Sequence, residues 1–155
     1  MDRKLVFVCS PYSGNIKENT RIAAEICKVI YSKTTFLPVA PHLYFPQFLD
    51  DNVQADRDAG IKYGLELMDK CEAVIAVCDN RTVSAGMKKE LEYAEKHNKP
   101  VVLFGDDCEM LLYLSCNTGN LDYLIKQQIT LNQGKLVKRP PNSNKTREGI
   151  DDENI

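Results

Sequence analysis

Runs of apolar residues alternate with amphipathic stretches along most of the chain. Four short apolar runs, LVFVC, TFLPVAP, AVIAVC and PVVLFG, begin at residues 5, 35, 73 and 100. Polar and apolar residues recur with helical spacing over residues 16–32, 54–70 and 84–97. Apolar strands that alternate with helices are typical of a parallel α/β sheet with right-handed crossovers. The pattern therefore predicts such a sheet, with both of its faces covered.

The remaining segments have a weaker secondary-structure pattern. Pro38 indicates that the second strand lies at an edge of the sheet. Residues 41–51, PHLYFPQFLDD, are expected to form an aromatic loop bracketed by prolines. After Gly105, EMLLYLSC and LDYLIKQQI predict two short helices packed on the sheet edge. The final residues are rich in Lys, Pro, Asn and Asp, so we expect one domain over residues 1–133 and a disordered tail over residues 134–155.

Composition narrows the classes of function. A net charge of −2 gives no electrostatic signature of a nucleic-acid partner or an anionic membrane. No run of 18 apolar residues occurs, and the first apolar stretch is too short for a signal peptide. Cys9 and Cys78 lie in runs that read as buried strands, and the six cysteines show no metal-ligand spacing. We therefore expect reduced thiols and a cytoplasmic protein.

Candidate chemistry should lie where the strands end, because open parallel sheets bind ligands outside the carboxyl ends of their strands. Four segments fall there, at residues 10–14, 41–58, 79–86 and 105–107. They supply small hydroxyl residues, glycines, aromatics and carboxylates. Neither a GxGxxG nor a GxxxxGK[ST] motif is present, so a dinucleotide-binding Rossmann site and a P-loop are not indicated.

The helix expected over residues 84–97 carries one unusual charge. Met87, Leu91 and Ala94 form its apolar stripe, yet Glu90 falls on the same side. An inward carboxylate could be a nucleophile with a raised pKa, or it could form a structural ion pair with a Lys or Arg. Ser84 could be a simple N-cap, or the first turn could bind an anion such as phosphate.

The aromatic segment offers further candidates. His42 could be a base or a hydrogen-bonded loop residue. Tyr44, Phe45 and Phe48 could form core or a platform on which a base stacks. A metal site at His42 with the neighbouring aspartates is not expected, because no convergent ligand spacing occurs.

Together these segments resemble a known superfamily. SPYSG after the first strand, PHLYFPQFLDD, GLELMDKCEAVIAV, SAGMKKELEYA and KPV look like the nucleoside 2-deoxyribosyltransferase superfamily over about residues 4–104. That superfamily includes the 2′-deoxynucleoside 5′-monophosphate N-hydrolases, and the sequence looks most like a branch encoded by phages and bacteria. The resemblance implies a flavodoxin-like doubly wound parallel sheet of four to five strands, in three α/β/α layers.

The resemblance also implies roles for individual residues. The nucleophilic glutamate of the superfamily corresponds to Glu90. The positions that hold a 5′-phosphate in nucleotide-cleaving members are Ser84, Gly86, Ser10, Ser13 and Gly14. We add to the predicted substrate-binding residues Tyr12, His42, Tyr44 and Met87. Members are usually homodimers or larger, with a neighbouring subunit completing the site. We expect a nucleoside or nucleotide as the small-molecule partner, with no cofactor and no metal.

One position departs from the superfamily pattern. Characterised members carry an aspartate that helps handle the base, eight residues before the acidic residue that opens the third strand. Counting back from Glu72 gives Gly64. We predict that Asp56 or Asp58 protonates the leaving base instead, with further candidates in Tyr12 and His42.

Two classes of function follow. The first is an enzyme that cleaves or transfers at the N-glycosidic bond of a nucleoside or nucleoside 5′-monophosphate. The second, prompted by Gly64, is a module that binds or sequesters a nucleotide without catalysis. A third and weaker alternative is a structural protein whose rim mediates oligomer contacts.

Overall fold

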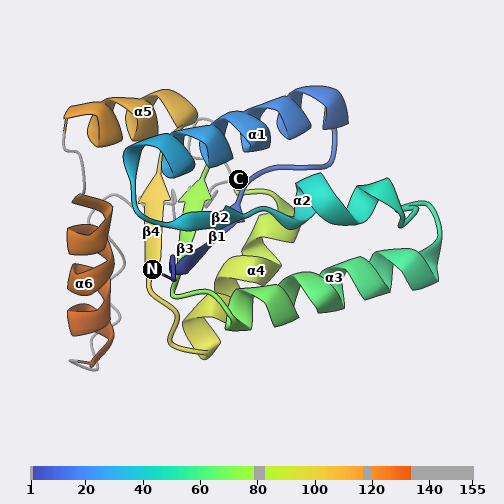
Figure 1. Ribbon diagram of the computed structural model, residues 1–155. Helices are drawn as coiled ribbons and strands as arrows, with labels where there is room; N and C mark the ends of the chain where they lie inside the picture. Colours follow the sequence, from blue (N-terminus) through green and yellow to red (C-terminus); the bar gives the residue numbers. More distant parts are fainter. Residues whose placement is uncertain (1, 79–82, 117–119, 134–155) are drawn as a thin grey trace, which may run out of the picture.

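The computed structural model describes residues 2–78, 83–116 and 120–133. Within them the chain forms four parallel strands and a series of helices in three layers (Figure 1). The expected tail over residues 134–155 lies outside the described residues.

The sheet has the strand order β2-β1-β3-β4, and every neighbouring pair is parallel. The strands are β1 (Leu5–Cys9), β2 (Leu37–Val39), β3 (Ala73–Val77) and β4 (Val101–Phe104). This is the order of the first four strands of a flavodoxin-like sheet. The expected fold class is therefore confirmed, and Pro38 lies in an edge strand as predicted.

Helices connect the strands and cover both faces of the sheet. They are α1 (Ile16–Lys33), α2 (Pro41–Tyr44), the 3₁₀ turn η1 (Phe45–Gln47), α3 (Gln54–Asp69), α4 (Ala85–Lys96), α5 (Asp107–Cys116) and α6 (Asn120–Gln133). In Figure 1, α1 and α5 lie above the sheet, whereas α3 and α4 lie below it.

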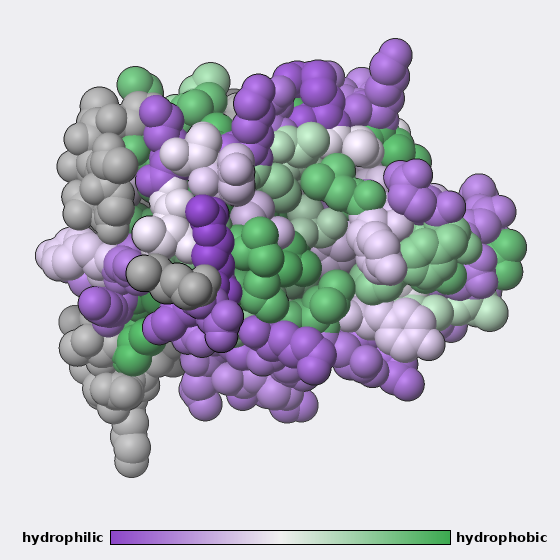
Figure 2. Space-filling model, viewed as in Figure 1, coloured by the Kyte–Doolittle hydropathy of each residue, from purple (hydrophilic) through white to green (hydrophobic). Residues whose placement is uncertain are grey.

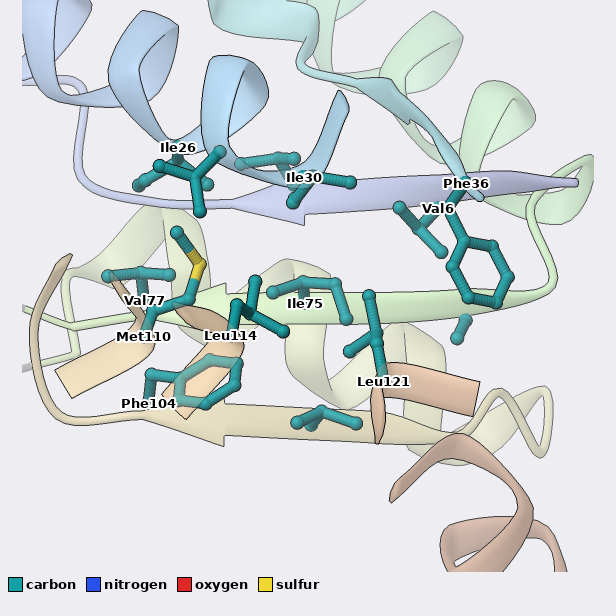
Figure 3. Packing of buried hydrophobic residues seen from close by; sticks show 14 of the residues in the cluster. Val6, Ile26, Ile30, Phe36, Ile75, Val77, Phe104, Met110, Leu114 and Leu121 are labelled. Carbon is teal, nitrogen blue, oxygen red and sulfur yellow. The ribbon is translucent and has the colours of Figure 1, made fainter. Parts of the chain in front are cut away.

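Each face of the sheet has its own core. On one face, buried side chains of β1, β3 and β4 pack against α1, α5 and α6, and Figure 3 shows Ile26 and Ile30 of α1 facing the layer that contains Ile75, Met110 and Leu114. On the other face, alternate residues of the same strands, such as Phe7 and Val74, pack against α3 and α4. Successive residues of a strand point to opposite faces, so strands buried on both faces must be apolar throughout.

One expectation about the elements was wrong. The segment expected as a loop after β2 instead forms α2 and η1, because Pro41 stands in the first turn of α2, where a missing N–H is harmless. The two helices expected at the sheet edge after Gly105 are α5 and α6, and both pack against the edge strand β4. Leu114 and Leu121 on these helices are buried to 0% and 1% exposure.

Cys9, Cys71 and Cys78 are buried free thiols and Cys27 is a partly buried one. The expectation that cysteines serve as small buried residues is confirmed at Cys9 and Cys78. In the described part of the chain, every helix is too short or too polar to cross a bilayer.

Candidate functional site

A cavity of about 200 Å³ opens where the carboxyl ends of the strands meet their following segments. It lies between α2, η1, α3 and the first two turns of α4, with Tyr12 contributed by the segment after β1. The chain adds β2 on one side of β1 and then crosses over to add β3 and β4 on the other side of β1. The direction in which strands are added therefore reverses between β1 and β3. Sheets of this kind bind ligands at that switch point.

The cavity has an apolar wall and a set of polar groups. The apolar wall comes from Pro41, Phe45, Pro46, Leu49, Ile61 and Leu65. The polar and charged residues among its lining are Tyr12, His42, Asp51, Asp56, Arg57, Lys89 and Glu90. A mainly apolar pocket with a few convergent polar groups is the usual form of a small-molecule site.

Glu90 is the most buried carboxylate of the cavity. The side chain is 17% exposed, and its Oε2 atom is buried without a hydrogen-bond partner among the described residues. Met87 and Ala94 on the same helix are in the core, so the helical phase that predicted an inward Glu90 is confirmed. Burial raises the pKa of Glu90 to about 7, and a hydrogen bond from the Cys9 thiol counteracts part of that rise.

His42 is the nearest described basic group to Glu90. Its Nε2 atom lies 4.0 Å from Glu90 Oε1, which is too long for a hydrogen bond. Burial lowers the pKa of His42, opposed by the charge of Asp51, so its imidazole is mainly neutral at pH 7. Among the described residues, no Lys or Arg forms a salt bridge with Glu90. The structural ion pair considered for this carboxylate is therefore absent from that part of the chain.

The imidazole of His42 lies near both the Glu90 carboxyl and the Tyr12 ring. The rings of Tyr12 and His42 lie 4.8 Å apart and are tilted by 30°. Burial raises the pKa of Tyr12. Both side chains therefore line the cavity as neutral groups that can stack on, or hydrogen bond to, a ligand.

The first turn of α4 supplies the second polar feature. Ser84 is its N-cap, and the Ser84 hydroxyl accepts a hydrogen bond from the Met87 N–H at 3.2 Å. Ala85 and Gly86 line the cavity, and so does Lys89, one turn further. Backbone N–H groups at a helix start, with the helix dipole and a lysine beside them, favour an anion.

The opposite wall is a stripe along α3 formed by Asp56, Gly60 and Gly64, which are spaced four residues apart. Asp56 Oδ2 accepts the backbone N–H of Asp50 at 2.9 Å. A Cβ atom added at Gly64 would contact only Pro41, at 3.8 and 3.9 Å. The two glycines thus make this wall flat where it approaches α2.

The structure brings together some of the predicted site residues and separates others. Those that line the cavity are Tyr12, His42, Asp56, Gly86 and Glu90. Those that do not line it are Ser10, Ser13, Gly14, Tyr44, Asp58, Ser84 and Met87.

The residues outside the cavity have other surroundings. Asp58 is exposed and accepts a hydrogen bond from Gln54 Nε2 at 2.8 Å. Met87 is in the core, with 1% of its surface exposed. Ser10 is buried at the end of β1, and its Oγ atom has no hydrogen-bond partner among the described residues. Ser13 and Gly14 are exposed, and Gly14 has a φ of +93°, which a glycine adopts without strain.

Tyr44 belongs to an exposed aromatic cluster beside the cavity. Its ring contacts those of Phe45 and Phe48 edge-on, at centroid distances of 5.3 and 5.2 Å. Tyr44 and Phe48 remain 62% and 58% exposed. Figure 2 shows apolar surface across the middle of one face, between hydrophilic borders above and below.

Sequence reasoning missed Asp51, Arg57 and Lys89 as lining residues. Asp51 and Arg57 face each other at 4.0 Å, and both side chains are 57% exposed. Lys89 falls on the polar side of α4 by helical phase, and only the approach of α3 makes that side part of a cavity. No group of three or more potential metal-ligating side chains occurs in the described ranges.

The chain belongs to the family described as Domain of unknown function (DUF7768), which matches residues 4–104. The match runs from the start of the sheet to the end of β4, so it includes every residue that lines the cavity. α5 and α6 follow it. A search of curated proteins gave no match.

Proposed function

We propose that the protein cleaves or transfers at the N-glycosidic bond of a nucleoside or nucleoside 5′-monophosphate, with Glu90 as the nucleophile. The observation that carries the proposal is the buried carboxyl of Glu90, which lines a cavity at the switch point of the sheet and whose Oε2 atom has no hydrogen-bond partner among the described residues. Buried carboxylates without a partner reduce stability and are found mainly where chemistry requires them.

The reaction has two steps. A Glu90 oxygen attacks C1′ while the bond from C1′ to the base nitrogen breaks and its electron pair leaves with the base. The transition state resembles an oxocarbenium ion, as in retaining glycoside cleavage. Water then attacks C1′ of the glycosyl ester and regenerates the carboxylate, whereas a second base in place of water gives transfer.

The start of α4 supports a 5′-phosphate on the substrate. Ala85 and Gly86 offer backbone N–H groups, and Lys89 and Arg57 add positive charge to the same cavity. We therefore favour hydrolysis of a 5′-monophosphate over transfer between free nucleosides.

A second candidate function is nucleotide binding without catalysis. It is favoured by the glycines at positions 60 and 64, which leave the α3 wall without a carboxylate where it approaches α2. Such a module would show ligand-dependent thermal stabilisation but would release no base.

The test is to incubate the purified protein with a panel of ribo- and deoxyribonucleosides and their 5′-monophosphates, and to measure free base by chromatography. Glu90→Gln should reduce release at least 10³-fold, an effect typical of removing a nucleophile. Glu92→Gln is the matched control, because Glu92 lies on the same helix with its side chain 63% exposed. Binding of panel members without release of base would favour the second candidate, and an active Glu90→Gln variant would remove Glu90 from the role of nucleophile.

We also propose a homodimer or larger assembly, as the superfamily resemblance implies, and a cytoplasmic location, as the use of cysteines as buried thiols indicates. The exposed rings of Tyr44 and Phe48 beside the cavity support a protein contact there. Sedimentation equilibrium of the wild type and of a Tyr44→Ser/Phe48→Ser variant tests this, since a monomeric wild type would contradict it.

A further inference from the structure

In the described part of the chain, the α3 wall of the cavity has no acidic side chain near Gly64, because the acid of that wall, Asp56, lies at the start of the helix. A Cβ atom added at Gly64 would lie 3.8 Å from Pro41, which precedes His42 in the sequence, and His42 Nε2 lies 4.0 Å from Glu90 Oε1. Gly64 thus marks the part of α3 that faces α2, and it lines the same cavity as His42 and Glu90. Asp56 is eight residues earlier on the helix, which corresponds to roughly 12 Å along its axis. Asp58 points away from the cavity toward Gln54.

The other polar groups near Glu90 do not replace that acid at neutral pH. Tyr12 is a phenol whose pKa is raised by burial, and His42 is an imidazole whose pKa is lowered by burial. Asp56 already accepts the Asp50 N–H. In the described residues, therefore, none of these side chains both lies beside Glu90 and carries a proton that it readily gives up at pH 7.

A neutral purine or pyrimidine leaves as an anion unless it is protonated, whereas a base that is cationic in the intact glycoside leaves as a neutral molecule. Gly64 and Glu90 line one cavity, and among the described residues no acidic side chain lines it beside Gly64. We propose from this arrangement that the substrate is a cationic N-glycoside, such as a pyridinium nucleotide or an N7-alkylated purine nucleotide. This proposal rests on the function proposed above. The electron pair of the C1′–N bond cancels the ring charge, so the base needs no proton, and hydrolysis of the glycosyl ester releases one proton to water.

The cavity also suits the charge of such a base. The rings of Tyr12, His42 and Phe45 line it, and cations are attracted to aromatic faces. Carboxylates of Asp51, Asp56 and Glu90 stand around the same space. The flat glycine stripe of α3 lets a planar ring approach the backbone closely.

The first test uses wild-type protein and matched substrate pairs that differ only in charge. 7-Methylguanosine 5′-monophosphate is compared with guanosine 5′-monophosphate, and their 2′-deoxy forms are compared in the same way. Nicotinamide mononucleotide is a third arm that distinguishes a pyridinium from a methylated purine. Each rate is divided by the uncatalysed rate in the same buffer, because cationic glycosides are also more labile in water.

We expect the rate enhancement for a cationic member to exceed that of its neutral partner at least 100-fold, the size of a typical general-acid contribution. Equal or greater enhancement for the neutral partner would overturn this proposal and leave the proposed function standing. Release of no base from either class would overturn both.

The second test introduces an acidic side chain at position 64, in the α3 wall of the cavity. Gly64→Asp should speed release from the neutral partners at least 10-fold and leave the rate on cationic substrates within a few-fold. Gly64→Asn is the matched control, because asparagine has the same shape as aspartate but no acidic proton. This variant should speed the release of base from neither the neutral nor the cationic substrates. Equal acceleration by both variants would assign the effect to shape and contradict the proposal.

Discussion

The carboxyl group of Glu90 is chemically useful, but its buried position lowers the stability of the fold. Its carboxyl is removed from water, and its Oε2 atom has no hydrogen-bond partner in the described residues. The raised pKa of about 7 measures this penalty, because burial opposes the charged form. The same environment makes an ionised Glu90 more reactive, since a poorly solvated carboxylate is a better nucleophile.

Glu90→Gln should therefore stabilise the protein at neutral pH while removing activity. The folded-state pKa of Glu90 is raised from 4.5 to about 7, so the folded state holds the proton more tightly. The penalty is absent below about pH 4.5, grows as pH rises, and is complete above about pH 7. We expect the variant to exceed the wild type in free energy of unfolding by up to about 3 kcal/mol at pH 8.

Urea denaturation of both proteins at pH 5 and pH 8 measures that difference. Glu92→Gln, on the exposed face of the same helix, should show no comparable gain at pH 8. A Glu90→Gln variant less stable than the wild type at pH 8 would mean that the charge has a partner that offsets its burial.

The pH dependence of the reaction should distinguish a nucleophile from an acid. A nucleophilic Glu90 acts as its carboxylate, so kcat/KM should rise about tenfold per pH unit below pH 7 and level off above it. Steady-state values of kcat/KM from pH 5 to pH 9 measure this rise and the plateau that follows it. A rate that falls as pH passes upward through 7 would instead assign Glu90 the role of a proton donor.

The start of α4 combines an N-cap with the site proposed for the 5′-phosphate. The Ser84 hydroxyl is engaged by the Met87 N–H, whereas Ala85 and Gly86 face the cavity. The cap thus holds the first turn in place, and the next residues line the cavity in which we propose that the substrate binds.

Ser84→Ala should reduce stability without changing substrate binding. Loss of a serine N-cap costs about 0.5–2 kcal/mol. KM for a 5′-monophosphate should stay within about twofold, because Ser84 is not among the cavity lining. Ser13→Ala, at an exposed position, is the control for stability. A large rise in KM with unchanged stability would place the Ser84 hydroxyl on the substrate.

The sequence predicted the strands and the long helices well, because these depend on local periodicity. LVFVC and AVIAVC are apolar throughout, and the structure places both in the middle of the sheet. The inward direction of Glu90 followed from helical phase alone. The region of His42 was predicted less well, since α2 is four residues long and depends on the packing around it.

The composition of the cavity could not be predicted by the same means. Lys89 and Asp51 become lining residues only because α3 and the segment after η1 approach α4. Asp56 and Asp58 looked equivalent in sequence, yet their spacing on α3 turns one toward the cavity and the other away from it. These distinctions depend on contacts between elements that are distant in sequence.

At the scale of the whole molecule, the domain extends beyond the residues that match the family. α5 and α6 follow the matched segment, but their buried residues Met110, Leu114, Leu121 and Ile125 belong to the same core as β1 and β3. α5 and α6 therefore complete the core on one face of the sheet, whereas the cavity lies beside the core that α3 and α4 form on the other face.

Leu114→Ala should destabilise the protein by about 2–5 kcal/mol, as for other leucines in a packed core. Leu112→Ala, two residues earlier on α5 and 67% exposed, should change the free energy of unfolding by less than about 0.5 kcal/mol. Thermal and urea unfolding of the two variants measures the contrast. Similar effects of both substitutions would mean that α5 does not share the core.

The edge strand β2 has a consequence for how the molecule behaves in a crowded solution. The N–H of Leu37 bonds to Lys4 O across the sheet, so the next residue, Pro38, turns its nitrogen to the open edge. That nitrogen carries no hydrogen, and β2 is only three residues long. A foreign strand that approached this edge would find no donor at its centre, so the proline protects the open side of the sheet against addition of further strands and against aggregation.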